Sequence, residues 1–317
     1  MRPTALLFTL ALLAACRKEE RISLRSFREI PGPVGEDLSS VAMYDSLNGV
    51  AVGGTPWESG CILSTRDGGQ TWQVDTLLGS KMECAGFDRT GQGYVCGQNY
   101  GFYRPPGSSR WDVFCVNYAW NKACCFPDDR HGAVVTGGSH RSGQVFCYGT
   151  DAFWRLDTLY ETVNALSDVC FSDSATAHAV GMGWVLRSAD AGATWQRLDV
   201  TGDFFRSVQF PDPNTGYICG SSGTLLKTTD GGKTWQEIRS GGSTGKRNKP
   251  FRALCFISAD TGYVVGSDGL FWQTLNGGAD WYQVEQAPGD ADFTDVFALG
   301  NRGWAVVEGG RIFYFER

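Results

Sequence analysis

The sequence predicts an all-β protein, a seven-bladed β-propeller of four-stranded antiparallel blades that is closed by an N-terminal strand completing the last blade. Three observations support this prediction: a short apolar strand recurs seven times, another apolar strand precedes each copy, and the chain is rich in Gly (42) and Phe (19). The copies lie 39 to 46 residues apart, a period that fits one four-stranded blade each. They begin at Gly49, Gly93, Gly132, Ala177, Gly216, Gly262 and Gly303.

Each repeat supplies the other strands of its blade. The strand before each of the seven recurring strands is apolar, as in residues 253–256. A third strand follows each recurring strand, as in residues 223–227. Turn residues separate these runs, which is typical of antiparallel blades. A fourth strand then opens with a tryptophan in six of the repeats. These tryptophans are Trp72, Trp111, Trp154, Trp195, Trp235 and Trp281.

The last repeat ends at its third strand, residues 311–315, and therefore lacks a fourth. The missing strand is available at the other end of the chain, because residues 26–30 match residues 234–238, with Phe27 in the position of Trp235. We expect this N-terminal strand to pair with the last repeat and to remove the exposed sheet edge at the seam. The propeller is thereby predicted to span residues 23–317.

The N-terminus predicts export. Arg2 is followed by an apolar run, residues 5–15, that is too short to span a bilayer as a helix and is typical of a signal peptide over residues 1–15. Residues 13–16 resemble the bacterial lipobox, which implies cleavage before Cys16 and lipidation of that cysteine. Residues 16–22 then form a lipid anchor and tether, and residues 17–20 resemble the surface-export signal of Bacteroidota lipoproteins. The predicted location is the bacterial outer membrane, either periplasmic or surface-exposed.

The mild acidity of the chain argues against a nucleic-acid partner, because its formal net charge is −6. The cysteines also argue against a framework of disulfides. Cys96 and Cys219 occupy one repeat site, and Cys125, Cys170 and Cys255 occupy another, where other repeats carry mostly small or apolar residues. We therefore expect most of them to be buried thiols, although a bridge or two remains open.

Four turns carry a sharper motif, Ser/Thr-x-Asp-x-Gly-x-Thr-Trp, of which the fourth copy is weaker. In this motif the Asp accepts backbone N–H bonds across its turn, the Gly takes a positive φ, and the Trp fills the blade core. The turns around Trp111 and Trp154 lack it. The motif residues are Thr65, Asp67, Gly69 and Trp72; Ser188, Asp190, Gly192 and Trp195; Thr228, Asp230, Gly232 and Trp235; and Thr274, Asn276, Gly278 and Trp281.

These Asp-boxes, together with the seven glycine-bounded strands, resemble the photosystem II assembly factor-like branch of the BNR/Asp-box propellers. The resemblance covers about residues 23–317. It implies a non-catalytic platform that helps to assemble membrane protein complexes, and it implies no photosynthetic role here.

The runner-up hypothesis is a sialidase-like or other glycoside hydrolase, because Asp-boxes also occur in such enzymes. Residues 27–31 are similar to the arginine motif of sialidases, but Glu29 is inserted, and the insertion reverses the faces of the residues after it. His131, His140 and His178 are scattered, and neither they nor the cysteines show the spacing of a metal site. We expect no cofactor, no metal and no catalytic residue.

A partner is best sought among residues that the repeat does not explain. The loops between second and third strands and the connections between blades share one face of a propeller, and they carry exposed aromatic and basic residues. This face predicts contact with a protein of the cell envelope or with a glycan, in addition to the membrane contact through the lipid. The predicted face comprises Trp57, Tyr100, Tyr118, Trp120, Arg141, Trp184, Lys246, Arg247 and Lys249.

Overall fold

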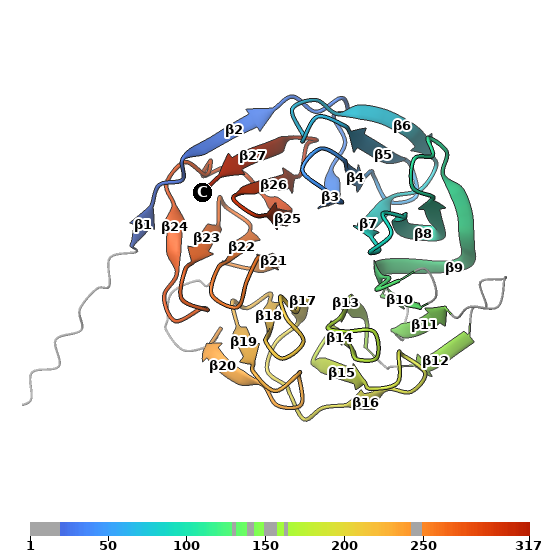
Figure 1. The fold of residues 1–317 in the computed structure, drawn as a ribbon, viewed down its shortest axis with the longest axis vertical. Coiled ribbons are helices and arrows are strands. Elements are labelled where there is room, and N and C mark those ends of the chain that lie inside the picture. Colours follow the sequence, from blue (N-terminus) through green and yellow to red (C-terminus); the bar gives the residue numbers. More distant parts are fainter. Residues whose placement is uncertain (1–19, 129–130, 138–142, 149–156, 162–163, 242–248) are drawn as a thin grey trace, which may run out of the picture.

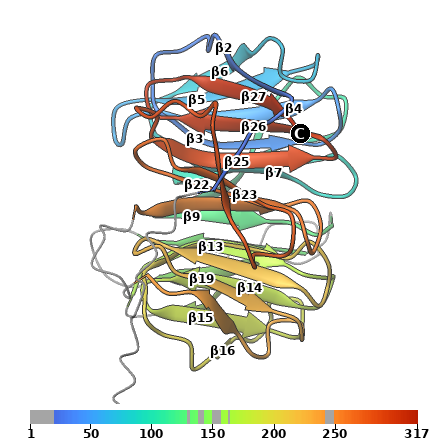
Figure 2. The ribbon, with the colours of Figure 1, turned by 90° about the vertical axis from the view of Figure 1, so that its left-hand side faces the viewer.

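The computed structural model describes residues 20–128, 131–137, 143–148, 157–161, 164–241 and 249–317. Their strands are arranged as a ring of sheets around a central axis (Figure 1), and the ring is a flattened disc when it is seen edge-on (Figure 2). Within these ranges every element is a β-strand. No helix among these residues has the length and hydrophobicity needed to cross a bilayer.

The strands follow one another around the ring in chain order. They are β1 (Arg21–Ile22), β2 (Ser26–Ile30), β3 (Leu38–Met43), β4 (Gly49–Gly53), β5 (Gly60–Thr65), β6 (Gln73–Leu78), β7 (Met82–Phe87), β8 (Gly93–Arg104), β9 (Asp112–Cys125), β10 (Gly132–Thr136), β11 (Gln144–Tyr148), β12 (Asp157–Glu161), β13 (Leu166–Phe171), β14 (Ala177–Gly181), β15 (Trp184–Ser188), β16 (Gln196–Arg197), β17 (Phe205–Gln209), β18 (Gly216–Gly220), β19 (Leu225–Thr228), β20 (Gln236–Arg239), β21 (Phe251–Phe256), β22 (Gly262–Gly266), β23 (Phe271–Thr274), β24 (Tyr282–Val284), β25 (Phe293–Leu299), β26 (Arg302–Val307) and β27 (Ile312–Glu316).

The all-β propeller is confirmed, but the expected seven blades are wrong: the described residues form six hydrogen-bonded sheets. Four of them have four strands, one has five, and one has six in the order β12-β11-β10-β9-β8-β7. The six-stranded sheet contains the two repeats that were expected to form separate second and third blades. Its strand β9 pairs with β8 through its first half and with β10 through its last residues.

The local sequence explains why these two repeats merge. Strand β9 is 14 residues long and contains neither Gly nor Pro, and it is rich in aromatic, Val and Cys residues that favour an extended backbone. Other repeats break at this point with a turn residue, such as Gly79 after β6 or Gly202 before β17. Since nothing interrupts β9, the outer strand of one repeat continues directly into the inner strand of the next.

The predicted N-terminal closure is present. Strand β2 pairs antiparallel with β27, with Phe27 opposite Phe315, so it forms the outer edge of the sheet β2-β27-β26-β25. The short strand β1 adds in parallel to β24 of the neighbouring sheet. The two ends of the chain are therefore joined side by side, as the blue and red strands in Figure 1 show.

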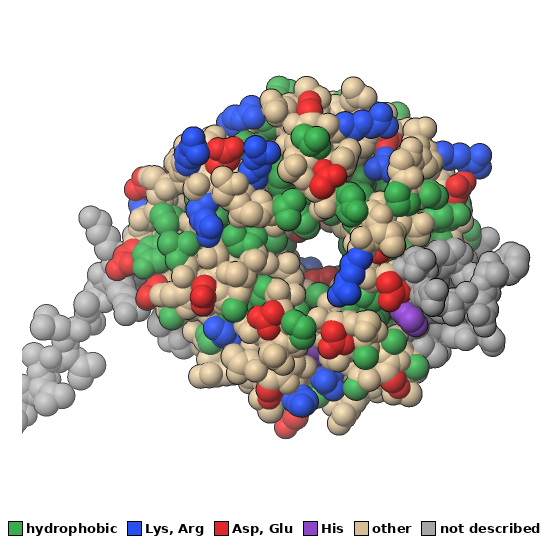
Figure 3. Space-filling model, in the orientation of Figure 1, with side chains coloured by type: hydrophobic (Ala, Val, Ile, Leu, Met, Phe, Trp, Pro, Cys, Tyr) green, Lys and Arg blue, Asp and Glu red, His purple; other side chains and the backbone are tan. Residues whose placement is uncertain are grey.

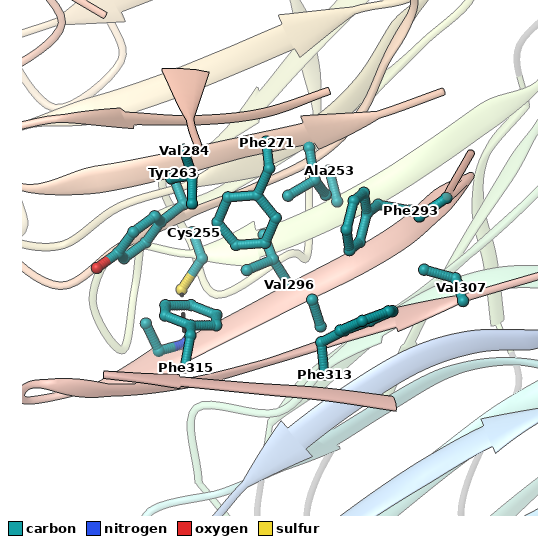
Figure 4. Close-up of a cluster of buried hydrophobic side chains, with 14 of the residues drawn as sticks. Ala253, Cys255, Tyr263, Phe271, Val284, Phe293, Val296, Val307, Phe313 and Phe315 are labelled. Atoms are coloured by element: carbon teal, nitrogen blue, oxygen red, sulfur yellow. Dashed lines mark hydrogen bonds between the residues drawn. The ribbon is translucent and has the colours of Figure 1, made fainter. Parts of the chain in front are cut away.

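Apolar side chains from adjacent sheets meet between the sheets and form the core. In the cluster beside the seam, Phe271, Phe293, Phe313 and Phe315 lie edge to face or tilted against one another, with centroid distances of 5.2 to 5.7 Å for the closest pairs (Figure 4). Such pairs add roughly 0.5–1.5 kcal/mol each beyond the burial of their surface. This packing joins β23 to β25 and β27 of the neighbouring sheet.

Candidate binding face and central channel

The four Asp-box turns share one hydrogen-bond pattern. In the first, Oδ1 of Asp67 accepts the N–H groups of Gln70 and Thr71, each at 3.0 Å, and Thr65 Oγ1 accepts the N–H of Gly69 at 2.9 Å. The Thr71 hydroxyl, which donates to Oδ2 of Asp67 at 2.6 Å, is the largest cause that lowers the pKa of Asp67 to about 2, and the backbone N–H of Thr71 is the next. The carboxylate is thus held by its own turn, which gives it a structural role.

The glycine of the motif lets adjacent sheets approach closely. Gly69 has φ +78°, and a Cβ there would lie 2.2 Å from Nε1 of Trp304, a fully buried residue of the neighbouring sheet. The Trp304 indole donates to the carbonyl of Gly68 at 3.1 Å. The motif therefore joins sheets as well as closing a turn, and these residues lie away from the axis.

A channel runs along the axis of the ring. The space has a volume of about 660 Å³ and is lined by residues of β3, β7, β9, β13, β17, β21 and β25. Figure 3 shows its opening, with basic and acidic side chains at the edge. Openings at the centre of a propeller are a common place for ligands and partners because many loops converge there.

Two carboxylates deep in the channel wall are already engaged. Asp168 accepts the N–H of Val208 at 2.8 Å, and Asp295 accepts the N–H of Val41 at 3.0 Å, so each links its own strand to the next inner strand. Burial is the main cause that raises the pKa of both to about 7. Their partners give both groups a structural role and leave no free acid–base pair in this part of the wall.

Seven residues surround one mouth of the channel, one from each of the inner strands β3, β7, β9, β13, β17, β21 and β25. Each is the second residue of its strand or, in the long strand β9, the residue at the equivalent position. We call this set the mouth ring. With neighbouring residues it encloses a hollow of about 570 Å³, in which four cations (Lys81, Lys122, Arg206, Arg252) outnumber two carboxylates (Glu83, Glu308). The mouth is therefore positive in a chain whose overall charge is negative. The ring comprises Ser39, Glu83, Lys122, Ser167, Arg206, Arg252 and Thr294.

The charges of the mouth are partly compensated. Lys122 Nζ lies 3.1 Å from Glu83, and Arg252 lies 2.6 Å from Glu308. Arg206 donates through Nε to Ser221 Oγ at 2.6 Å and lies over the Phe204 ring. Burial lowers the pKa of Lys122, and Glu83 opposes this shift. A positive potential thus remains at the mouth, and it favours an anionic group of a ligand.

Two of the predicted aromatic residues meet beside this mouth. The rings of Trp57 and Trp120 are 6.3 Å apart and nearly perpendicular, and Lys122 Nζ lies 3.7 Å from the Trp120 ring. Trp120 also donates from its indole to Glu83. Trp57 is 64% exposed and has φ +64°, and its N–H donates to the buried Gln98 at 2.8 Å.

The other predicted residues do not join this group. Trp184 is half-buried under Arg197, Tyr100 packs against Phe102, and Lys249 donates to the carbonyl of Asp268. The side chain of Tyr118 lies outside the described residues, as do Arg141, Lys246, Arg247 and Cys16.

Sequence reasoning missed Lys122, Arg206 and Arg252. The available signal was their shared repeat position, one residue after the start of the inner strand or equivalent to it, which carries a polar or charged residue in all seven repeats. The three cysteines Cys84, Cys96 and Cys124 were also missed as a group, because they lie on three different strands. Their sulfur atoms all lie within 4.8 Å of one another.

The chain is similar to known proteins in both sequence and fold. The model of the family described as "Photosynthesis system II assembly factor YCF48" matches residues 148–239 and 196–314. A structure described as YCF48 bound to D1 peptide has a TM-score of 0.74 at 16% identity and covers 95% of this chain and 100% of its own.

Two further structures share the fold. YCF48 from Cyanidioschyzon merolae has a TM-score of 0.70 at 15% identity, covering 92% of this chain and 98% of its own. The WD40 propeller domain of Doa1 has a TM-score of 0.66 at 9% identity, covering 93% and 97%. No curated protein sequence matches the chain.

Proposed function

Since the chain belongs to the photosynthesis system II assembly factor YCF48 family, we propose that it is a non-catalytic scaffold that binds a protein partner at the mouth ring and the adjoining tryptophans. One solved relative is described with a bound D1 peptide, which favours a peptide segment as the class of ligand. The chemical class of the bound segment is inferred from the residues at the mouth of this chain, and a role in photosystem II is not implied.

The observation that carries the proposal is the backbone of Trp57. A non-glycine residue with φ near +60° costs on the order of 1–3 kcal/mol, and a large indole that remains 64% exposed returns little of that cost in the folded protein. Trp57 is held in this conformation by the buried Gln98. Strained backbone clusters at functional sites, and binding hot spots are enriched in tryptophan, so the pair of tryptophans favours a binding role.

The charge of the mouth specifies the ligand further. Arg206 and Arg252 lie at the mouth with Lys122, and guanidinium groups bind carboxylates through paired hydrogen bonds. We therefore propose that the bound segment carries acidic side chains or a free C-terminal carboxylate near an apolar residue. The apolar residue would pack on Trp57 and Trp120.

A glycosidase fits these residues less well. Such an enzyme needs a pair of carboxyl groups roughly 5–9.5 Å apart that are free to act on the substrate. In the described mouth, Glu83 is bonded to Lys122 and Trp120, and Glu308 is paired with Arg252. The carboxylates deeper in the wall are bonded to backbone N–H groups.

The predicted location completes the proposal. Lipidation of Cys16 would hold the propeller at the bacterial outer membrane, on its periplasmic side or at the cell surface. Two or three acyl chains at roughly 0.8 kcal/mol per buried CH₂ give nearly permanent anchoring. The partner is then expected among proteins of the cell envelope.

Affinity purification of the tagged full chain from native membranes tests the proposal. We expect one stoichiometric protein partner, with recovery reduced at least about tenfold by Trp57→Ala or by Arg206→Gln, which remove groups of the mouth. The matched controls are Leu77→Ala, which removes an apolar side chain that is 67% exposed on the outer strand β6, and Lys249→Ala. Both controls should retain the partner.

Two results would contradict the proposed scaffold. A partner that both mouth variants retain would show that binding occurs elsewhere. Cleavage of a glycan panel by the purified chain at enzyme-like rates, abolished by Glu83→Gln, would replace the scaffold by a hydrolase.

A further inference from the structure

Three cysteines converge where the two repeats merge into one sheet. Cys84 of β7 and Cys96 of β8 stand directly opposite each other in the strand pairing, and Cys124 of β9 reaches the same point. The sulfur atoms of Cys84 and Cys124 are 4.0 Å apart, and all three lie within 4.8 Å of one another. No disulfide links them, since an S–S bond is about 2.05 Å long.

These separations fit a metal ion. A Zn²⁺ ion binds thiolate sulfur at about 2.3 Å, which places the sulfurs of neighbouring ligands roughly 3.8–4.0 Å apart in tetrahedral or trigonal geometry. One pair already has this separation. The others need to close by less than about 1 Å, which side-chain rotation can supply without movement of the strands.

The surroundings provide both shelter and access. Cys96 is fully buried and Cys124 nearly so, in an aromatic cluster that includes Tyr94, Phe114 and Phe126. Cys84 is only half-buried, and it lines the central channel together with Cys124. An ion can therefore reach the three sulfurs through the channel and keep one coordination position open to it.

The equivalent positions elsewhere in the ring do not gather thiols. Around Cys219, which occupies the site of Cys96 in another repeat, the residue opposite is Ser207, and Leu254 of the next inner strand stands where β9 carries Cys124. Cysteine as a small apolar filler explains a single thiol such as Cys219. It does not explain three thiols with their sulfurs turned toward one point.

We propose that Cys84, Cys96 and Cys124 form a binding site for one thiophilic closed-shell cation, Zn²⁺ or Cu⁺. Each sulfur binds as a thiolate, so three protons leave through the channel for each ion bound. The bound ion ties β7, β8 and β9 together where the two repeats merge.

The test is a metal titration of the purified, reduced full chain under anaerobic conditions, with Zn²⁺ and Cu⁺ in separate arms and a chromophoric chelator as competitor. We expect one equivalent to bind, and the arm with the tighter binding identifies the preferred metal. Cys96→Val and Cys124→Val should weaken binding by roughly 100-fold or more. Both place a residue that other repeats carry at these positions, such as Val52 and Val208, so folding should persist.

Cys219→Val is the matched control, because it removes a buried thiol at the same repeat position and should leave binding unchanged. Melting temperature gives a second readout: the metal should raise it in the parent and in Cys219→Val, and leave Cys124→Val unaffected. Failure of the reduced chain to bind either ion overturns the proposal. A Cys84–Cys124 disulfide in the chain isolated from its own cells overturns it as well.

Discussion

The seam between the two ends of the chain can be tested through one side chain, Phe27. Its ring lies 5.4 Å from both Phe271 and Phe313 and 6.2 Å from Phe315, while its backbone belongs to the five-residue pairing of β2 with β27. Phe27→Ala removes the ring and leaves the backbone pairing possible. The change therefore measures what the N-terminal strand contributes to the core.

The magnitude follows from the burial of the ring. Replacement of a fully buried Phe by Ala costs about 3–5 kcal/mol, and Phe27 is only partly buried, so we expect a loss of roughly 2–3 kcal/mol in the free energy of unfolding. For a chain of this size that loss corresponds to a fall in melting temperature of roughly 4–10 °C.

Thermal and urea unfolding of the parent and the variant provide the assay. Glu29→Ala is the control on the same strand, because Glu29 is exposed and its ion pair with Arg311 contributes less than about 1 kcal/mol. A melting temperature of Phe27→Ala within about 1 °C of the control would refute the contribution of the Phe27 ring to the core at the seam.

Three further predictions follow from other parts of the structure. Gly69→Ala should destabilise the protein by roughly 2–4 kcal/mol in urea unfolding, because φ is +78° and the new Cβ would meet Trp304. The control Gly79→Ala has open space around it and should change the free energy of unfolding by less than about 0.5 kcal/mol. Equal effects of the two substitutions would contradict the proposed role of the turn. The pKa of Asp295 is about 7 in the folded protein and higher than its unfolded value, so its contribution to stability is fully present below about pH 4 and is lost as the pH rises through 7. Asp295→Asn should therefore flatten the pH dependence of the unfolding free energy by up to about 1.4 kcal/mol per pH unit between pH 4 and 7, whereas an unchanged slope would show that this carboxyl is ionised in the fold. Finally, Cys16→Ala should release the protein from membranes, and a variant that still sediments with membranes after a high-salt wash would exclude the lipid anchor.

Much of the fold could be predicted because its signals are local and repeated. A glycine-bounded apolar strand and the motif ending at Trp72 depend on neighbours within a few residues, so a single sequence reveals them. The closure by β2 was also predictable, because residues 26–30 match the outer strands of the repeats.

The number of sheets was harder to predict, because it depends on whether the chain turns between repeats. Strand β9 shows the difficulty: each half matches its own repeat, and only the lack of Gly and Pro across residues 112–125 indicates that the two halves are continuous. That signal is weaker than the regular spacing of the glycine-bounded strands.

The site was predicted only in part, for a physical reason. Trp57 and Trp120 stand out as large aromatics that the repeat does not explain, and they do meet. Lys122, Arg206 and Arg252 lie within strands, at a repeat position that is polar or charged in every inner strand, so none of them stands out in the sequence. Only the ring closure brings residues so distant in sequence to one mouth.

The most direct test of the proposed scaffold is photo-crosslinking in living cells. A photoreactive phenylalanine analogue in place of Trp57 lies at the mouth, whereas the same analogue in place of Leu77 lies on an outer strand with similar exposure. We predict one discrete crosslinked envelope protein from position 57, reduced by Arg206→Gln, and none from position 77. Crosslinks from position 77 alone, or none from position 57, would contradict binding at the mouth ring.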